Sequence, residues 1–363
     1  MNFQLFFQGI IEIILSLFTG LFVFFISFKV FNVLTQDIDE IEELKKNNIA
    51  LAILVSSFIF GIMLLIKIVI IPATDTLKFI FFNDKINFYL IFISILRIIS
   101  FYLISALFSF SILWFSIKLF MHLTTRMDEM EQIKNNNASI ALVISVLIIS
   151  ITLILNHPFS KLIDGFVAPP VISNNLKQPF INLSVFFNGL IELIIAIIAA
   201  IFIFFLSLRI INLFLKKNIK EYEELKKNNF AVAVMVSSFI FAMMLLIKTA
   251  VEPAYNVFEN AFEKAAKIQG ILFGVGQIIL FFILSAFFSF IILWLAMKAF
   301  MIFTKKIDEI TEMKNKNIAI SIVIAILVLS AALLVEHGLS ILLNSFVKYP
   351  EVGKGLLDIT NFK

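Results

Sequence analysis

Eight long runs of apolar residues, separated by short polar segments, dominate the chain. The runs lie near residues 5–33, 49–71, 87–121, 138–156, 184–214, 230–250, 270–302 and 318–336. About 20 apolar residues in an α-helix cross the hydrocarbon core of a bilayer, which is about 30 Å thick. The pattern therefore predicts eight transmembrane helices. The odd-numbered runs are longer than needed, so we expect them to tilt or to extend beyond the bilayer.

The composition also indicates an all-α membrane protein. Apolar residues make up 61% of the 363 positions and charged residues 15%, and the mean hydropathy is +1.04, which excludes a water-soluble fold. The chain has 45 phenylalanines but 11 glycines and 7 prolines, which favours unbroken helices over the strands of a barrel. It has no cysteine, and its net charge of +4 gives no case for nucleic-acid binding.

One motif recurs in the polar links that follow the odd-numbered runs. The links end in ELKKNNIA, QIKNNNAS, ELKKNNFA and EMKNKNIA, and their last asparagines are Asn48, Asn137, Asn229 and Asn317. These asparagines are 89, 92 and 88 residues apart, and a regular period of this kind defines the architecture of a chain. We predict four repeat units of two helices each, at residues 1–82, 83–172, 173–262 and 263–363.

The first and third units match each other, and so do the second and fourth. The matches include Gly9 and Glu12 with Gly189 and Glu192, and Trp114 and His157 with Trp294 and His337. This indicates duplication of a pair that was already a duplication. Because each unit has two helices, successive units enter the membrane in the same orientation, so the repeats are parallel.

The link motif resembles that of the bacterial inner-membrane family catalogued as domain of unknown function 350. It consists of an acidic stretch, Glu-Leu-Lys, an asparagine and then Ala-x-Ala at the start of a helix. Members of that family typically pair two such units, so the resemblance implies a tandem doubling, and it supplies no activity. Where the family usually has glycine before the asparagine, this chain has Asn47, Asn136, Asn228 and Lys316. Asparagine tolerates a left-handed backbone better than lysine does, so we expect the turn at Lys316 to differ.

The distribution of basic residues predicts which side of the membrane the links occupy. Of the Lys and Arg residues, 17 lie on or beside the links, 11 lie on the opposite side, and Arg97 lies within a helix. The positive-inside rule then places the links in the cytoplasm and both termini outside.

The links themselves are expected to form short amphipathic helices. Ile38, Ile41 and Leu44 fall on one stripe among acidic residues. The corresponding residues are Met127, Met130 and Ile133 in the second unit and Ile307, Ile310 and Met313 in the fourth. The stripe is either a docking face for a cytoplasmic protein or part of an ordinary helix end with solvated charges.

Two sets of polar residues recur at fixed places around the links. The four motif asparagines precede the even-numbered helices, where they are expected to cap the first turn; a ligand site made of four amides is the alternative. The motif lysines are Lys45, Lys134, Lys226 and Lys314. A second basic set lies 19 or 20 residues before the asparagines and comprises Lys29, Lys118, Arg209 and Lys298. This set predicts either snorkelling anchors or a cationic ring for anions or lipid head groups.

Glu12 and Glu192 are carboxylates within apolar runs. An ionised acid at the bilayer centre costs roughly 2.5–3.5 kcal/mol on the insertion scale, so such residues often mark an ion or proton path. We expect Arg97 to lie at a comparable depth and to be able to pair with Glu12, whereas Gln277 takes the corresponding place beside Glu192. Alternatively, both glutamates lie near the outer interface and stay hydrated.

No sequence motif points to an enzyme. We find no phosphate loop, no metalloprotease motif and no nucleophile with its base, and His157 and His337 lack acidic residues at metal-ligand spacing. We therefore expect no catalytic site, cofactor or metal, and only the lipid bilayer as a sure partner. A scaffold with acidic cytoplasmic links is favoured, because the second and fourth units have no counterpart of Glu12. The alternative is a channel or transporter with a path near the glutamates; the oligomeric state is left open.

Overall fold

The computed structural model describes residues 3–35, 38–82, 88–123, 128–166, 182–214, 220–264, 268–304 and 307–347. Within these ranges the chain is helical almost throughout and contains no strand. Eight of the helical segments are long and apolar enough to cross a membrane. The prediction of an all-α membrane fold with eight spanning helices is confirmed.

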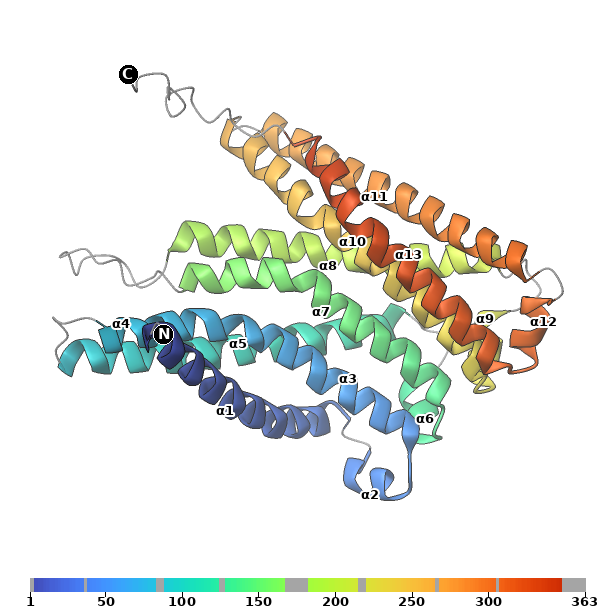
Figure 1. Ribbon diagram of the computed structural model, residues 1–363, viewed down its shortest axis with the longest axis horizontal. Coiled ribbons are helices and arrows are strands. Elements are labelled where there is room, and N and C mark those ends of the chain that lie inside the picture. Colours follow the sequence, from blue (N-terminus) through green and yellow to red (C-terminus); the bar gives the residue numbers. More distant parts are fainter. Residues whose placement is uncertain are drawn as a thin grey trace.

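Each unit contains a long outer helix, a short link helix and a long inner helix (Figure 1). The outer helices are α1 (Phe3–Leu34), α5 (Phe88–Leu123), α8 (Leu183–Phe214) and α11 (Ile268–Phe303). The link helices are α2 (Glu40–Lys45), α6 (Glu129–Lys134), α9 (Glu221–Lys226) and α12 (Glu309–Lys314). The inner helices are α3 (Ile49–Ile66), α7 (Ala138–Phe166), α10 (Phe230–Lys264) and α13 (Ile318–Asn344). In the first unit, α3 continues through the 3-10 turn η1 (Lys67–Val69) into α4 (Ile70–Phe82).

The inner helices are longer than the apolar runs that predicted them. The run at 138–156 becomes a helix that ends at Phe166, and the run at 230–250 one that ends at Lys264. The backbone groups still require hydrogen bonds where the side chains become polar, so helix and apolar run need not end together. Pro72 cannot donate to the carbonyl of Ile68, and the 3-10 turn lies just before it. The corresponding Pro253 lies inside the continuous helix α10.

The inner helices form a row, and the outer helices lie against this row (Figure 1). Along the row α3 packs on α7, α7 on α10, and α10 on α13. Each of α5, α8 and α11 contacts two inner helices, one from its own unit and one from the unit before. Among the inner segments described, α1 contacts only α3 and α4 of its own unit. The units therefore follow one another head to tail, and within the part of the chain that the structure describes the row is open at both ends.

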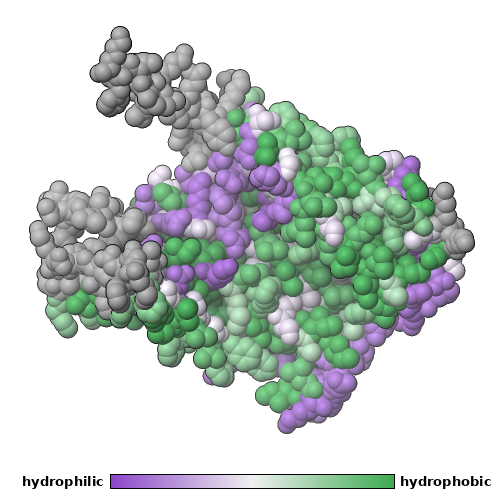
Figure 2. Space-filling model, viewed as in Figure 1, coloured by the Kyte–Doolittle hydropathy of each residue, from purple (hydrophilic) through white to green (hydrophobic). Residues whose placement is uncertain are grey.

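The core lies mainly along the inner helices. Phe58, Ile62, Phe159 and Phe239 are fully buried there, whereas the outer helices expose large apolar side chains over much of their length. Figure 2 shows this broad apolar surface, with hydrophilic residues gathered at the edge where the link helices lie and at the opposite end. Such a surface matches contact with the hydrocarbon region of a bilayer.

Candidate functional site

Each link is a short helix followed by a left-handed turn. Asp39, Asp128 and Asp308 accept backbone N–H groups at the starts of three link helices, and Lys220 takes this place in the third unit. After each link helix one residue has a positive φ. These residues are Asn47 (60°), Asn136 (58°), Asn228 (53°) and Lys316 (64°).

The expectation that the turn at Lys316 differs is wrong. Its φ of 64° places it in the same left-handed region as the three asparagines. A lysine has no short side chain that bonds to its own backbone in this conformation, so the turn is held against its local preference. The hydrogen bond from the Asn317 N–H to the Glu312 carbonyl, 3.0 Å long, closes the turn as its counterparts do in the other units.

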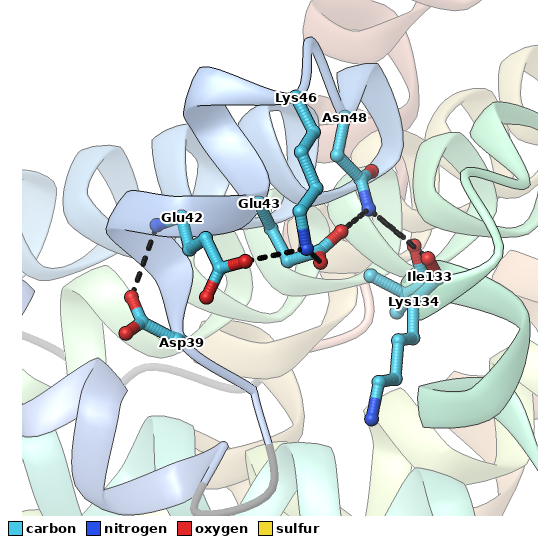
Figure 3. A network of polar contacts seen from close by, with 7 residues as sticks. All are labelled: Asp39, Glu42, Glu43, Lys46, Asn48, Ile133 and Lys134. Carbon is cyan, nitrogen blue, oxygen red and sulfur yellow. Dashed lines mark hydrogen bonds and ion pairs between the residues drawn. The ribbon is translucent and has the colours of Figure 1, made fainter.

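Asn48 joins the first unit to the second (Figure 3). Its Oδ1 accepts the backbone N–H of Leu51 at 2.9 Å and so caps α3. Its Nδ2 donates to Glu43 Oε2 at 3.1 Å within the same link and to the carbonyl oxygen of Ile133 at 3.0 Å in the next one. The side chain is buried, so a single amide satisfies groups in both units away from water.

The same contact recurs at the next two junctions. Asn137 Nδ2 donates to Gln132 Oε1 and to the carbonyl oxygen of Leu225, each at 2.9 Å. Asn229 Nδ2 reaches the carbonyl oxygen of Met313 at 3.0 Å. Both asparagines also cap their own inner helices through Oδ1. Three junctions along the row are thus built from one repeated residue.

A second set of hydrogen bonds joins the left-handed residues of the second and third links to the inner helix of the preceding unit. Asn136 Oδ1 accepts the backbone N–H of Ala50 at 3.1 Å, and Asn228 Oδ1 accepts that of Ser139 at 3.1 Å. Lys316 cannot accept in this way, and its Nζ instead lies 3.5 Å from the carbonyl oxygen of Lys227. The junction between the third and fourth units therefore differs from the two before it.

Charged groups reinforce the links locally. The hydrogen bond from Asn48, followed by that from Lys46, holds the pKa of the Glu43 carboxyl below its ordinary value. In the third unit burial alone raises the pKa of the Glu224 carboxyl, but hydrogen bonds from Asn229 and Lys227 outweigh burial and lower it overall. The motif glutamate is thus ionised at neutral pH in both units, where it accepts from the motif asparagine.

Only some of the acidic side chains of the links are exposed to solvent. Glu40 is buried and hydrogen-bonds to Thr35, as Glu309 does to Thr304. Two shared positions carry exposed acids: one holds Glu42, Glu131 and Glu223, and the other holds the capping residues Asp39, Asp128 and Asp308. The motif lysines Lys45, Lys134, Lys226 and Lys314 are exposed three residues after the first of these positions. The outward surface of the row therefore carries paired negative and positive charges.

The last position of the apolar stripe is covered in the second, third and fourth units, whereas Ile41 is 55% and Ile307 43% exposed. Ile133, Leu225 and Met313 are buried, and their link helices α6, α9 and α12 contact the inner helix of the preceding unit. Leu44, at the same position in the first unit, is 37% exposed. Met127, which the stripe also includes, lies outside the described residues. In the last three units this one position of the stripe thus packs units together.

The basic set near the ends of the outer helices does not surround an axis. Lys29, Lys118, Arg209 and Lys298 are all exposed on the outer helices of an open row. Lys298 Nζ lies 4.2 Å from the ring centroid of Trp294, within cation–π distance.

Glu192 is a buried carboxylate held by the preceding unit. Its side chain on α8 is 0% exposed, and its Oε1 lies 2.8 Å from His157 Nδ1 on α7. Its Oε2 lies 3.5 Å from Lys161 Nζ, which also lies 3.9 Å from the ring centroid of Tyr255 on α10. Three helices thus meet at this cluster, which we name the carboxylate cluster.

The sequence reasoning missed the partners of Glu192. It placed Gln277 beside the glutamate and treated His157 as remote from acids, yet His157 contacts Glu192 across 35 residues. The signal that pointed to them was the spacing of His157 and Lys161, four residues apart on one helical face. Gln277 is half-buried on α11.

Two glycines bring α7 and α8 close enough for this contact. A Cβ atom at Gly189 would lie 2.5 Å from the backbone nitrogen of Leu162, and one at Gly165 would lie 2.4 Å from that of Phe186. The Asn182 N–H donates to the Gly165 carbonyl at 2.8 Å. Small residues at a crossing allow such close approach of helices in a membrane.

Glu12 has a different environment from its counterpart Glu192. It is half-buried on α1, and Arg97 is half-buried on α5, a helix that contacts α1. Pairing between these two side chains stays a prediction.

Comparison with known proteins gives one match. The family described as Domain of Unknown Function (DUF350) matches residues 4–157 and 184–288, which together exceed half of the chain. The two segments fall in the two halves of the repeat, in agreement with a tandem doubling of the domain. No curated protein and no solved structure matches the chain.

Proposed function

Because the chain belongs to the DUF350 family, whose description names no activity, we propose a function from its own geometry: a non-enzymatic scaffold of the bacterial inner membrane. The link helices are its docking surface, which lies in the cytoplasm according to the positive-inside rule. The apolar helices fix the position and spacing of that surface.

The observation that carries this proposal is the bonding of the links to one another. Amides of Asn48, Asn137 and Asn229 connect each link to the next by hydrogen bonds of 2.9–3.0 Å. The links of the row are therefore held at fixed spacing instead of moving independently. Fixed spacing of repeated groups supports multivalent binding, in which weak contacts at each unit add up.

The exposed charges indicate the chemistry of the partner. Glu42, Glu131 and Glu223 repeat at one exposed position of the row, whereas the last apolar position of the stripe is buried between units. A cytoplasmic protein with a row of basic residues matches these carboxylates. The same partner requires acidic residues next to its basic ones, to face the neighbouring motif lysines. Complementary charges of this kind set specificity and association rate more than raw affinity.

Site-specific photo-cross-linking from the link helices tests the proposal. A cross-linked protein that is lost when Glu42, Glu131 and Glu223 are changed together to glutamine supports it, and its failure to appear at any link position counts against it.

A channel or transporter is the second candidate, and the carboxylate cluster favours it. Glu192 is fully buried within a membrane-spanning helix and contacts His157 and Lys161, and buried ionisable groups of this kind often form proton or ion paths. Its test is ion and proton flux into liposomes that contain the protein. Flux above that of empty vesicles, lost in the double variant Glu12→Gln, Glu192→Gln, establishes transport; equal flux in protein and empty vesicles removes this candidate.

A further inference from the structure

The last unit of the row carries half of a junction that nothing in the described chain completes. Asn317 Nδ2 donates to Glu312 Oε2 at 2.8 Å, as its counterparts do within their links. The other three motif asparagines are buried beneath the following link, whereas Asn317 is half-exposed. Ala319 is exposed as well, although Ala50 is fully buried. Among the described residues, no following unit offers a carbonyl to the amide of Asn317.

The first unit carries the other half. Leu44 is 37% exposed, whereas Ile133, Leu225 and Met313 at its position lie beneath the preceding unit. The outer helix α1 also lacks a neighbour, because α5, α8 and α11 each contact the inner helix of the unit before and α1 has none. The exposed surface of the first unit is thus the surface that every other unit uses to bind its predecessor.

The duplication makes the two ends match in chemistry as well as in shape. The junction between the second and third units joins His157 to Glu192. The residues 180 positions away from these two are His337, exposed on α13, and Glu12, half-buried on α1. The two ends of the chain therefore carry the same acid and the same histidine that meet at the junction between its halves.

We propose that the fourth unit of one copy binds the first unit of a second copy, head to tail, through the junction that joins the second and third units within the chain. In this contact Asn317 donates to the carbonyl of Leu44 in the second copy. Glu12 of the second copy lies against His337. Such a heterologous contact builds a closed ring if its rotation closes and an extended row if it does not.

Polar groups distinguish a second copy from lipid as the occupant of these ends. The apolar surface alone suits lipid equally well; Leu334 is 83% exposed where Leu246 is buried. Lipid tails, however, offer no carbonyl to the half-exposed Asn317 amide and no acid to His337. The first unit offers both: its link carbonyl occupies a position that accepts an asparagine at three internal junctions, and its Glu12 a position that contacts a histidine at one.

Some residues of the junction between the second and third units differ in the contact between copies. Ile341 stands where Lys161 lies near Glu192, so the contact between copies has no counterpart of that lysine. Ser345 stands where Gly165 allows close approach to Phe186. Ser345 caps the end of α13, and its Cβ requires the contact between copies to be wider at this point than the contact of Gly165 with Phe186.

Cysteine cross-linking in membranes tests the proposal, because the chain has no cysteine of its own. One copy carries Phe6→Cys and a differently tagged copy carries Ser345→Cys, and both positions are exposed. After co-expression, a short bismaleimide is expected to give a heterodimer that carries both tags. Each variant expressed alone gives no dimer, because the contact joins different surfaces of the two copies. Phe186→Cys replaces Phe6→Cys as the matched control and gives no dimer, since its surface is occupied by α7.

A second substitution tests whether Asn317 contributes to the contact between the two copies. Asn317→Ala on the Ser345→Cys copy lowers the heterodimer yield about fivefold, as expected for the loss of one hydrogen bond. The same substitution on the Phe6→Cys copy has a smaller effect, because that copy contributes its first unit to the cross-linked contact. The proposal is overturned if co-expressed copies give no heterodimer although both cysteines react in detergent, or if either variant dimerises alone.

Discussion

The amide nitrogen of Asn48 lies 3.0 Å from the carbonyl oxygen of Ile133, although 85 residues separate the two. The same side chain caps α3 through its oxygen. One residue of the motif thus begins an inner helix and fixes the next unit beside it. Because Asn137 and Asn229 do the same, the spacing of the links follows from a local motif repeated along the chain.

The motif asparagines are expected to differ in their effects on stability. Asn229→Ala removes a buried amide that bonds to Glu224 and Met313, and this lowers the free energy of unfolding by about 1–3 kcal/mol. Asn317→Ala removes an amide bonded only within its own link among the described residues, and it costs at most about 1 kcal/mol. Denaturant unfolding of the monomeric protein in detergent compares the two. Equal losses would show that the bonds between units contribute nothing.

Lys316 is expected to limit the stability of the last junction. Lys316→Asn relieves the left-handed strain and offers an Oδ1 to the Ala231 N–H, as Asn136 does to Ala50. We expect a gain of about 1 kcal/mol in the free energy of unfolding. Lys314→Asn makes the same change of residue type on the preceding link helix and gives no gain. Thermal unfolding of both variants tests this prediction. A lower stability of Lys316→Asn than of the parent protein would contradict this account of the turn.

The close crossing of α7 and α8 predicts opposite effects at two equivalent glycines. Gly189→Ala places a Cβ 2.5 Å from the Leu162 backbone, whereas Gly9→Ala meets no atom within 4 Å. The first substitution costs about 1–3 kcal/mol through overpacking. The second is neutral or stabilises by about 0.5–1 kcal/mol, because alanine favours the helix. Denaturant titrations in detergent measure both, and a tolerated Gly189→Ala would rule out the close crossing.

The link of the third unit is expected to lose stability in acid. The pKa of Glu224 lies below its ordinary value of 4.5, so folding favours the ionised carboxylate. The resulting stabilisation is complete above the unfolded pKa and is lost as the pH falls through the folded pKa. Glu224→Gln keeps an acceptor for Asn229, as Gln132 does for Asn137, but does not titrate. The difference in Tm between parent and variant therefore shrinks as the pH falls from neutral to about 3; a constant difference would contradict the prediction.

Much of the fold was predictable from the sequence, because lipid imposes a simple rule. Apolar runs of sufficient length predict the spanning helices, and a motif repeated four times predicts the units. The ends of the inner helices were not predictable in this way: α7 continues past His157 and Pro158 to Phe166. Hydropathy marks the part of a helix that lies in lipid, not the part that stays hydrogen-bonded beyond it.

The contacts between units were harder to foresee. Helix capping by Asn48, Asn137 and Asn229 follows from their place before the inner helices. The same expectation is wrong for Asn317, whose side chain makes no capping bond. The acceptor that each amide N–H group reaches in the next unit depends on how the units pack. The same holds for Glu192 and His157, which are 35 residues apart in sequence. Contacts of this range depend on the order of helices in the row, which neither residue spacing nor periodicity determines.

The docking role of the link row is tested most directly by cross-linking from Lys45, Lys134 and Lys226, each replaced in turn by a photoreactive amino acid. The measurement compares cells that carry otherwise unchanged links with cells that carry Glu42→Gln, Glu131→Gln and Glu223→Gln together. Photolabels at exposed lipid-facing positions such as Phe18 and Leu107 serve as controls. The scaffold account predicts one cytoplasmic protein cross-linked from all three link positions, absent from the controls and strongly reduced in the triple variant. Cross-links to no cytoplasmic protein, or to one that the triple variant retains in full, would contradict it.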